Sequence, residues 1–378
     1  MSLHLRMMHE PRSATSSRFV WHGRVVQEAA YLIGRTTYSG KKMQRGSFNF
    51  MASHEIYASA PKNWYVSPVQ CDCFWLDMIV NPPQGSGVPD PIKGYFQDLK
   101  KRVEESLEKR FIYMYGSRKK IRLDTKRPLS KSLFSRDIAV NVFVGVERRR
   151  QRIRCDLTPL GIVDPKTCKV HATDKFLTIS QDGERWVSTS IHDFLQMCAI
   201  EDIGLSTDIH YVGLTKNPHE RPLNRQHRGY SDMVYGIGSD DNDFFLFVTV
   251  FKVMTSGAHS ASGFNFFVSN SMTDEVAVQP EGHLIEGALI AYFDSPYQDE
   301  QGAGERAKLE AQLRRAKLER SIESVVIDFD VEGDSPYYRL RSRARSAANR
   351  HVFRCCLVDD KLCIEPLPES LDATTLFR

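Results

Sequence analysis

An uninterrupted apolar segment, Phe244 to Phe251 (FFLFVTVF), constrains the fold of this chain more than any other feature. Its aromatic and β-branched residues are typical of a strand, and it is too short to cross a bilayer as a helix. Because apolar and polar side chains do not alternate along it, both of its faces should be covered. We therefore expect a central strand in a sheet that is flanked by helices.

Other segments suggest how the chain is divided. Helices are expected at residues 99–110, 283–293 and 304–325, and strands at 138–146 and 209–213. A chain of 378 residues exceeds the size at which one hydrophobic core usually stops growing. We predict an α+β, multidomain protein. Its expected parts are a mixed N-terminal region (1–185) suited to target recognition, a small mixed sheet flanked by helices (186–300), and a helix with a small β extension (301–378).

Composition and charge set limits on partners and compartment. The net charge of +4 is too mild to prove a polyanionic partner, but Lys and Arg cluster at residues 118–127 and 148–154. Each cluster suits either a phosphate backbone or a solvated basic face. No segment resembles a signal peptide, and the eight cysteines show no metal-binding pairs. We expect a cytoplasmic protein with free thiols and no membrane partner.

Two segments carry residues suited to chemistry. In residues 209–230 (IHYVGLTKNPHERPLNRQHRGY), Tyr211 begins a Tyr-Val-Gly strand end, and Arg221 follows ten residues later. In residues 281–298 (EGHLIEGALIAYFDSPYQ), Glu286 lies within an apolar helix, and Gln298 follows a Ser-Pro-Tyr turn. The value of these features lies in their order and spacing, because each is common when taken alone.

The two segments resemble the GIY-YIG nuclease superfamily over about a hundred of the 378 residues. In that family a Tyr-Ile/Val-Gly strand precedes an arginine by about ten residues, as Tyr211 precedes Arg221. A later helix carries the metal-binding glutamate in a pattern like LLExxLI, which LIEGALI matches with Glu286. Gln298 lies where members often have an asparagine. The resemblance implies a GIY-YIG-like mixed sheet at residues 186–300 and a nuclease activity.

Phosphodiester hydrolysis explains why such residues would converge. The resemblance implies that Glu286 holds Mg²⁺ (or Mn²⁺), a cation that proteins bind through one or two carboxylates and several waters. The fixed fork of an arginine suits phosphate oxygens, so Arg221 would bind the phosphate. Tyr211, His227 or Tyr230 would position or deprotonate the attacking water. Gln298 completes the set of candidate catalytic residues.

Each candidate also has a purely structural alternative. Glu286 could face solvent on the far side of its helix, and Arg221 could form a surface salt bridge. Tyr211 could pack with its hydroxyl bonded to a neighbour. His227 could be incidental and Gln298 a turn residue.

One departure from the family pattern leaves a second hypothesis open. The first family tyrosine should lie about eleven residues before Tyr211, where this chain has Ile200. The first hypothesis is a metal-dependent endonuclease. Its expected partner is double-stranded DNA, and RNA is the alternative substrate. Analogy with the family suggests a role in restriction or phage defence. The second hypothesis is a catalytically weak or inactive relative that binds nucleic acid or regulates.

Overall fold

The computed structural model describes residues 17–19, 44–77, 91–105, 107–108, 110–131, 138–181, 183, 186–201, 203–218, 220–223, 228–298, 302–331 and 339–368. Its helices are α1 (Asn49–Ala52), α2 (Glu55–Ser59), α4 (Pro91–Glu105), α5 (Ile191–Cys198), α6 (Arg228–Ile237), α7 (Asn270–Thr273), α8 (Val278–Phe293) and α9 (Gly302–Arg320). None of these helices is long and apolar enough to span a membrane.

The strands form three sheets. The central one has nine strands: β2 (Lys62–Trp75), β3 (Phe111–Lys119), β11 (Thr207–Thr215), β12 (Asn242–His259), β13 (Phe264–Ser269), β14 (Ile322–Asp330), β15 (Leu340–Arg341), β16 (Arg350–Val358) and β17 (Lys361–Pro366). Two smaller sheets contain β1 (Ser17–Phe19), β8 (Lys169–Ala172), β9 (Phe176–Ser180) and β10 (Trp186–Ser190), and β4 (Ile121–Leu123), β5 (Leu129–Lys131), β6 (Ile138–Val144) and β7 (Arg149–Cys155).

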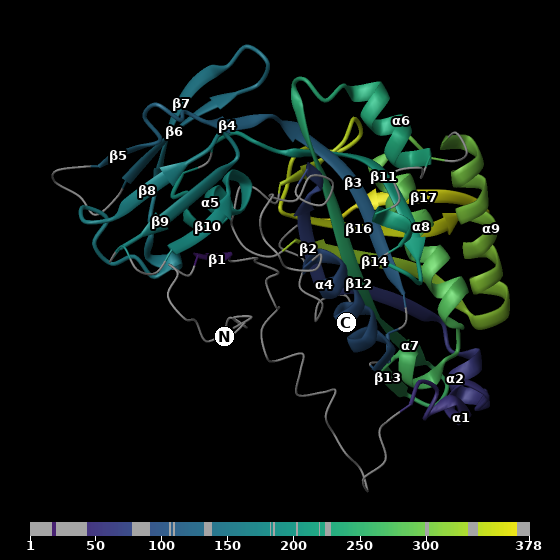
Figure 1. Cartoon of the computed structure of the whole chain (residues 1–378). Coiled ribbons are helices and arrows are strands. Elements are labelled where there is room, and N and C mark those ends of the chain that lie inside the picture. Colours follow the sequence, from purple (N-terminus) through teal and green to yellow (C-terminus); the bar gives the residue numbers. More distant parts are fainter. Residues whose placement is uncertain are drawn as a thin grey trace, which may run out of the picture.

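The predicted apolar strand is confirmed as part of β12, mostly in its first half, and β12 pairs antiparallel with both β2 and β3. Phe245 and Phe247 enter the core on one face, and Phe244 and Leu246 enter the core on the other. On the first face the sheet packs against α8 and α9, and on the second against α4 and α6 (Figure 1). The expectation that helices cover both faces is therefore confirmed, and so is the α+β class.

A large excursion interrupts the central sheet between β3 and β11. After β3 the chain leaves the sheet, builds β4 to β10 and α5, and then returns as β11, which pairs antiparallel with β3. We call residues 121–198 the inserted lobe; it lies beside the body that contains the central sheet (Figure 1). Two strands that lie side by side in the sheet are thus far apart in the sequence.

The sheet spans the predicted boundary at residue 185. It takes β2 and β3 from before that residue and β11, β12 and later strands from after it. The predicted C-terminal helix ends at Arg320, earlier than expected, and the chain at once forms β14, which pairs parallel with β2. The helix and strands described after residue 301 therefore belong to the helical cover and to the central sheet.

A buried charge cluster joins the inserted lobe to the body. The carboxylate of Asp243, at the start of β12, accepts two hydrogen bonds from Arg122 (2.8 and 3.0 Å) and one from the Ile121 amide (3.1 Å). His192 Nε2 lies 2.8 Å from the same carboxylate. Arg122 and His192 belong to the lobe, so these bonds fix its position relative to the sheet.

Candidate functional site

Arg221 and Glu286 meet on the side of β11 that faces away from β3, beyond the short pairing of β11 with β15. The backbone amide of Leu214 donates to Glu286 Oε1 at 2.7 Å, and Arg221 Nη1 donates to the Leu214 carbonyl at 3.3 Å. Both Leu214 groups belong to the part of β11 that pairs with β3 on its other side. The guanidinium and the carboxylate, which are far apart in the sequence, therefore meet around one residue.

Glu286 faces the sheet and is only partly accessible. Its side chain is 20% exposed, and His283 Nδ1 lies 3.3 Å from Oε2. Burial raises the pKa of Glu286, whereas His283, the Leu214 amide and the charge of Arg221 lower it. The alternative in which Glu286 points to solvent on the far side of α8 is thereby excluded. His283 was not among the sequence candidates, although its spacing of three residues from Glu286 places both on one helix face.

Gly213, the glycine of Tyr-Val-Gly, makes room for two tyrosine rings. It pairs with Tyr113 of β3, and a Cβ atom at Gly213 would lie 2.6 Å from Tyr113 Cζ and 2.8 Å from Tyr211 Cε1. The ring centroids of Tyr113 and Tyr211 are 5.8 Å apart. Any larger residue would push these rings apart, so the sequence of β11 is adapted to hold Tyr113 beside Tyr211.

Tyr113, a fully buried residue of β3, contacts the candidate Tyr211 and was not among the sequence candidates. It is the third residue of β3, in the segment Phe111-Ile112-Tyr113. The position eleven residues before Tyr211, where the family pattern places its first tyrosine, is occupied by Ile200. This residue is 49% exposed and lies outside β11. The inserted lobe separates Tyr113 from Tyr211 in the sequence, so spacing could not identify it. Its Ile-Tyr pair in an apolar strand was the available signal.

A cavity of about 330 Å³ opens at this edge of the sheet. β11, α8, α9 and the segments beside them line it. The lining residues are Tyr211, Arg221, His283, Glu286, Gly287, Ile290, Gln298, Glu305, Lys308, Leu309 and Gln312. Four sequence candidates are among them: Tyr211, Arg221, Glu286 and Gln298. The sequence analysis assigned α9 to the C-terminal part of the chain and did not expect it to line the site. Another cavity, lined by Trp64, Arg354 and Cys356 among others, contains none of the candidates.

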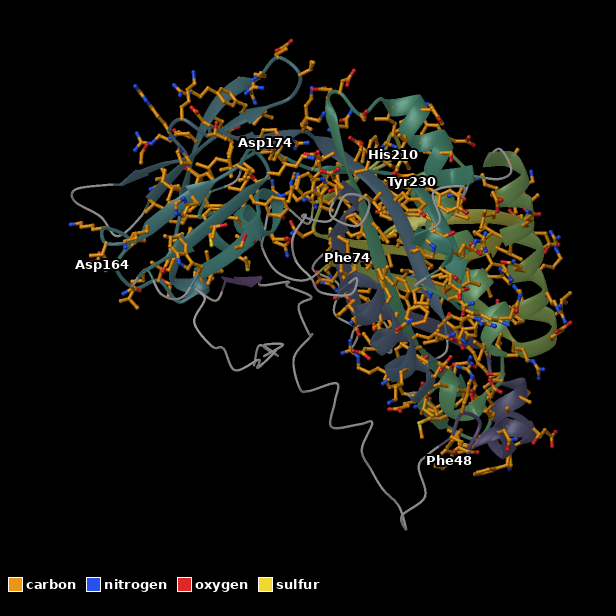
Figure 2. The ribbon with its side chains drawn as sticks, viewed as in Figure 1. Phe48, Phe74, Asp164, Asp174, His210 and Tyr230 are labelled. Atoms are coloured by element: carbon orange, nitrogen blue, oxygen red, sulfur yellow. The ribbon has the colours of Figure 1, made fainter. Side chains whose placement is uncertain are left out.

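The remaining candidates have different positions. Tyr230, on α6, is not among the residues that line the cavity; its ring packs against Tyr115 at 5.8 Å. The Tyr115 hydroxyl donates to the Pro222 carbonyl at 2.7 Å and so holds the turn that carries Arg221. Figure 2 places Tyr230 and His210 at the end of the body near α6, and Phe48 at the opposite end. His227 lies outside the described residues.

The side chains of the cavity fit a hard divalent cation better than zinc. Among the described residues, no group of three or more His, Cys, Asp or Glu side chains could hold a metal ion, as a structural zinc site requires. The cavity offers Glu286 and Glu305 as carboxylates, with Gln298 and Gln312 as amides. Mg²⁺ is commonly held by one or two carboxylates, with waters and substrate phosphate as its other ligands. Glu286 fits that role, because its carboxylate lies within the cavity beside Arg221.

The two basic clusters differ in their surroundings. Arg118 is buried, with its guanidinium over the Phe245 ring and Nε bonded to Thr207, and Arg122 binds Asp243. These two arginines of the first cluster serve the fold. The second cluster follows the hairpin into β7, where the arginines are exposed and Ile153 and Cys155 are buried. On β7 the exposed arginines are Arg149, Arg150, Arg152 and Arg154.

Comparison with known proteins gives no relative from which a function could be transferred. No family model, curated protein or solved structure matches the chain. A function must therefore be argued from the residues of the cavity and their geometry.

Proposed function

We propose that the chain is a metal-dependent endonuclease that hydrolyses phosphodiester bonds of DNA, through a module similar to the GIY-YIG nucleases. The observation that carries the proposal is that one cavity is lined by Tyr211, Arg221, Glu286 and Gln298. The sequence analysis had predicted these residues as the catalytic and metal-binding candidates. They belong to two separate segments, which could have lain far apart in the fold. Structural roles alone give no reason for all four to line the same cavity.

Each side chain has a role in the proposed hydrolysis. Arg221 binds the phosphate, because a guanidinium offers several donors to phosphoryl oxygens and stabilises the charge that grows on them. Glu286 would hold a divalent cation, which supplies further positive charge for those oxygens when it is bound. His283, beside Glu286, is within the cavity and can take or give a proton. Gln298 contributes a hydrogen bond from its amide.

Tyr113 is our candidate for the role of the family's first tyrosine, because its ring lies beside that of Tyr211 on the neighbouring strand. Burial raises the pKa of Tyr113, the neighbouring Tyr211 raises it further, and Arg221 lowers it. Tyr113 is therefore a neutral phenol near pH 7. We assign it to orienting Tyr211, whose ring it contacts, and not to accepting a proton.

The inserted lobe would hold the nucleic acid. Arg150 pairs with Asp124, and Arg154 pairs with Glu201 at 3.4 Å, so these arginines form a partly neutralised row on β7 with Arg152 between them. Lysine and arginine contacts to phosphates position a duplex without reading its sequence. In this proposal the lobe is a separate target-binding domain within a multidomain protein. A role in restriction or phage defence rests on likeness to the family alone.

The proposal is tested with supercoiled plasmid and the purified full-length chain. Mg²⁺ should allow nicking or linearisation, and an excess of EDTA should stop it. Retarded plasmid that stays intact with both Mg²⁺ and Mn²⁺ would instead favour the second hypothesis, a binding protein without cleavage. Parallel reactions with a structured RNA distinguish the two nucleic acids.

Replacing Tyr211 with phenylalanine should slow cleavage by about 10²–10⁴-fold, the usual contribution of a positioned proton-transfer group. The ring, which packs against Tyr113 and Tyr115, would remain. Single-turnover cleavage under Mg²⁺ measures the effect. Tyr235→Phe is the matched control, because that tyrosine is 89% exposed on α6. Equal rates for the two variants would remove Tyr211 from the reaction.

Gly287→Ala should make the protein more stable and at the same time less active. A Cβ at Gly287 would lie 3.5 Å from Leu309 Cδ1 and 3.6 Å from Gln312 Oε1, which is ordinary contact, so α8 should gain up to about 1 kcal/mol of stability. The added methyl narrows the cavity, and cleavage should fall about tenfold or more because reacting groups tolerate little displacement. Gly94→Ala, in open space on α4, is the control. Cleavage unchanged in a stabilised Gly287→Ala would contradict this use of the cavity.

A further inference from the structure

Two residues that line the cavity each have a buried amide atom without a hydrogen-bond partner in the part of the chain that the structure describes. These atoms are Nε2 of Gln298, just after α8, and Oε1 of Gln312, on α9. Leaving a buried polar atom without a partner costs roughly 1–3 kcal/mol. Both residues line the cavity beside Arg221 and Glu286. Such atoms mark a place where a ligand would complete the hydrogen bonds.

The two atoms differ in what they need. Gln298 Nε2 is a donor and requires an acceptor, whereas Gln312 Oε1 is an acceptor and requires a donor. The substrate's phosphate could serve only the donor and the waters of a bound cation only the acceptor, so two separate groups would be needed. A nucleobase edge offers both, and glutamine is a familiar partner for such edges.

The rest of the wall suits the flat face of a base. Ile290 and Leu309 supply apolar side chains, and Gly287 leaves α8 without a side chain between them. Pockets that read an extruded base combine apolar contact with its faces and hydrogen bonds to its edge. A base that entered this cavity, which is lined by residues of α8, α9 and β11, would leave its stack.

We propose that this cavity is a nucleobase-binding subsite, in which Gln298 and Gln312 read the edge of an unstacked base next to the phosphate held by Arg221. This inference rests on the proposed function, because it places the base within a nucleic-acid substrate. In this proposal α9 forms the side of the cavity that selects which base is bound. The nuclease would therefore prefer sites at which a nucleotide is unpaired or easily unstacked, since extrusion then costs less.

Binding without cleavage tests the subsite. Short duplexes that carry one unpaired nucleotide, with each of the four bases in turn, are titrated with the full-length chain in EDTA, and fluorescence anisotropy gives each Kd. The wild type should discriminate the best from the worst base by about tenfold or more. Gln312→Leu, which keeps the side-chain bulk, should bring the four Kd values to within about twofold. Arg315→Ala, which removes a side chain that is 72% exposed on α9, should keep the discrimination.

Three results would overturn the subsite. They are equal binding of all four bases by the wild type, discrimination that persists in Gln312→Leu, or a preference that follows a ribose 2′-hydroxyl at the unpaired position instead of the base. Because the titration needs neither metal nor cutting, its failure is distinct from that of the nuclease. Cleavage without base preference refutes only the subsite, and base preference without cleavage refutes only the enzyme. A chain that binds none of the duplexes refutes both.

Discussion

Glu286→Gln should fold normally and cleave at least about 10³-fold more slowly than the wild type. A bound cation stabilises the charge of a phosphoryl transition state by several kcal/mol, and each 1.36 kcal/mol is a factor of ten in rate. The amide keeps an oxygen that can accept the Leu214 N–H, but it removes the charge that would hold the cation. Single-turnover cleavage of plasmid in Mg²⁺ measures the loss.

The pKa of Glu286 adds a pH signature to this prediction. Because burial raises that pKa above its ordinary value of 4.5, the carboxyl takes up its proton at a higher pH than an exposed glutamate does. Cation affinity, which needs the ionised form, should therefore fall on acidification before pH 4.5 is reached. A raised pKa also means that the folded protein disfavours the ionised form of Glu286, so its negative charge lowers the free energy of unfolding at neutral pH. Glu286→Gln should therefore be at least as stable as the wild type.

Glu319→Gln is the matched control, because its side chain is 52% exposed on α9 and pairs with Arg315. It should cleave at the wild-type rate. A Glu286→Gln protein that cleaves within a few-fold of the wild type would remove the carboxylate from the chemistry.

Asp243→Ala should lower the free energy of unfolding by about 3–5 kcal/mol, the usual cost of leaving a buried ionic partner uncompensated. The change leaves the Arg122 guanidinium and the His192 ring without their shared acceptor. Burial alone would raise the pKa of Asp243, but His192 and Arg122 hold it below its ordinary value. The stabilisation is therefore present above pH 3.8, the ordinary value, and is lost as the pH falls toward the lowered one. Urea unfolding at pH 7 measures the effect.

Asp240→Ala provides the comparison, because Asp240 is exposed two residues before β12. It should change stability by no more than about 0.5 kcal/mol. If Asp243→Ala unfolds at the same urea concentration as Asp240→Ala, the cluster does not hold the lobe to the body. Since the lobe and the body share this cluster, we also expect Asp243→Ala to expose the lobe to proteolysis first.

The extent to which the sequence predicted this molecule depended on how local each signal was. β12 was predictable because its apolar residues follow one another in the sequence, and α8 because its apolar residues recur at helical spacing. The convergence of Tyr211, Arg221, Glu286 and Gln298 followed from ordered motifs in two segments. In each case the information lay within about twenty residues of sequence.

The features that were missed depend on distant parts of the chain. Tyr113 lies beside Tyr211 because β3 and β11 pair across the inserted lobe, and no spacing rule anticipates an insertion of that length. Gln312 lines the cavity because α9 packs on α8, which its own composition does not specify. The boundary placed at residue 185 followed a local composition change, whereas the sheet is assembled from strands on both sides of it.

Titration with Mn²⁺ tests the central claim most directly, because the free ion can be followed by its electron paramagnetic resonance signal. The wild type should bind one Mn²⁺ per chain when a short, uncleavable phosphorothioate duplex is present, and Glu286→Gln should lose that site while Glu319→Gln keeps it. Equal Mn²⁺ binding by the wild type and Glu286→Gln would show that this carboxylate does not hold the cation.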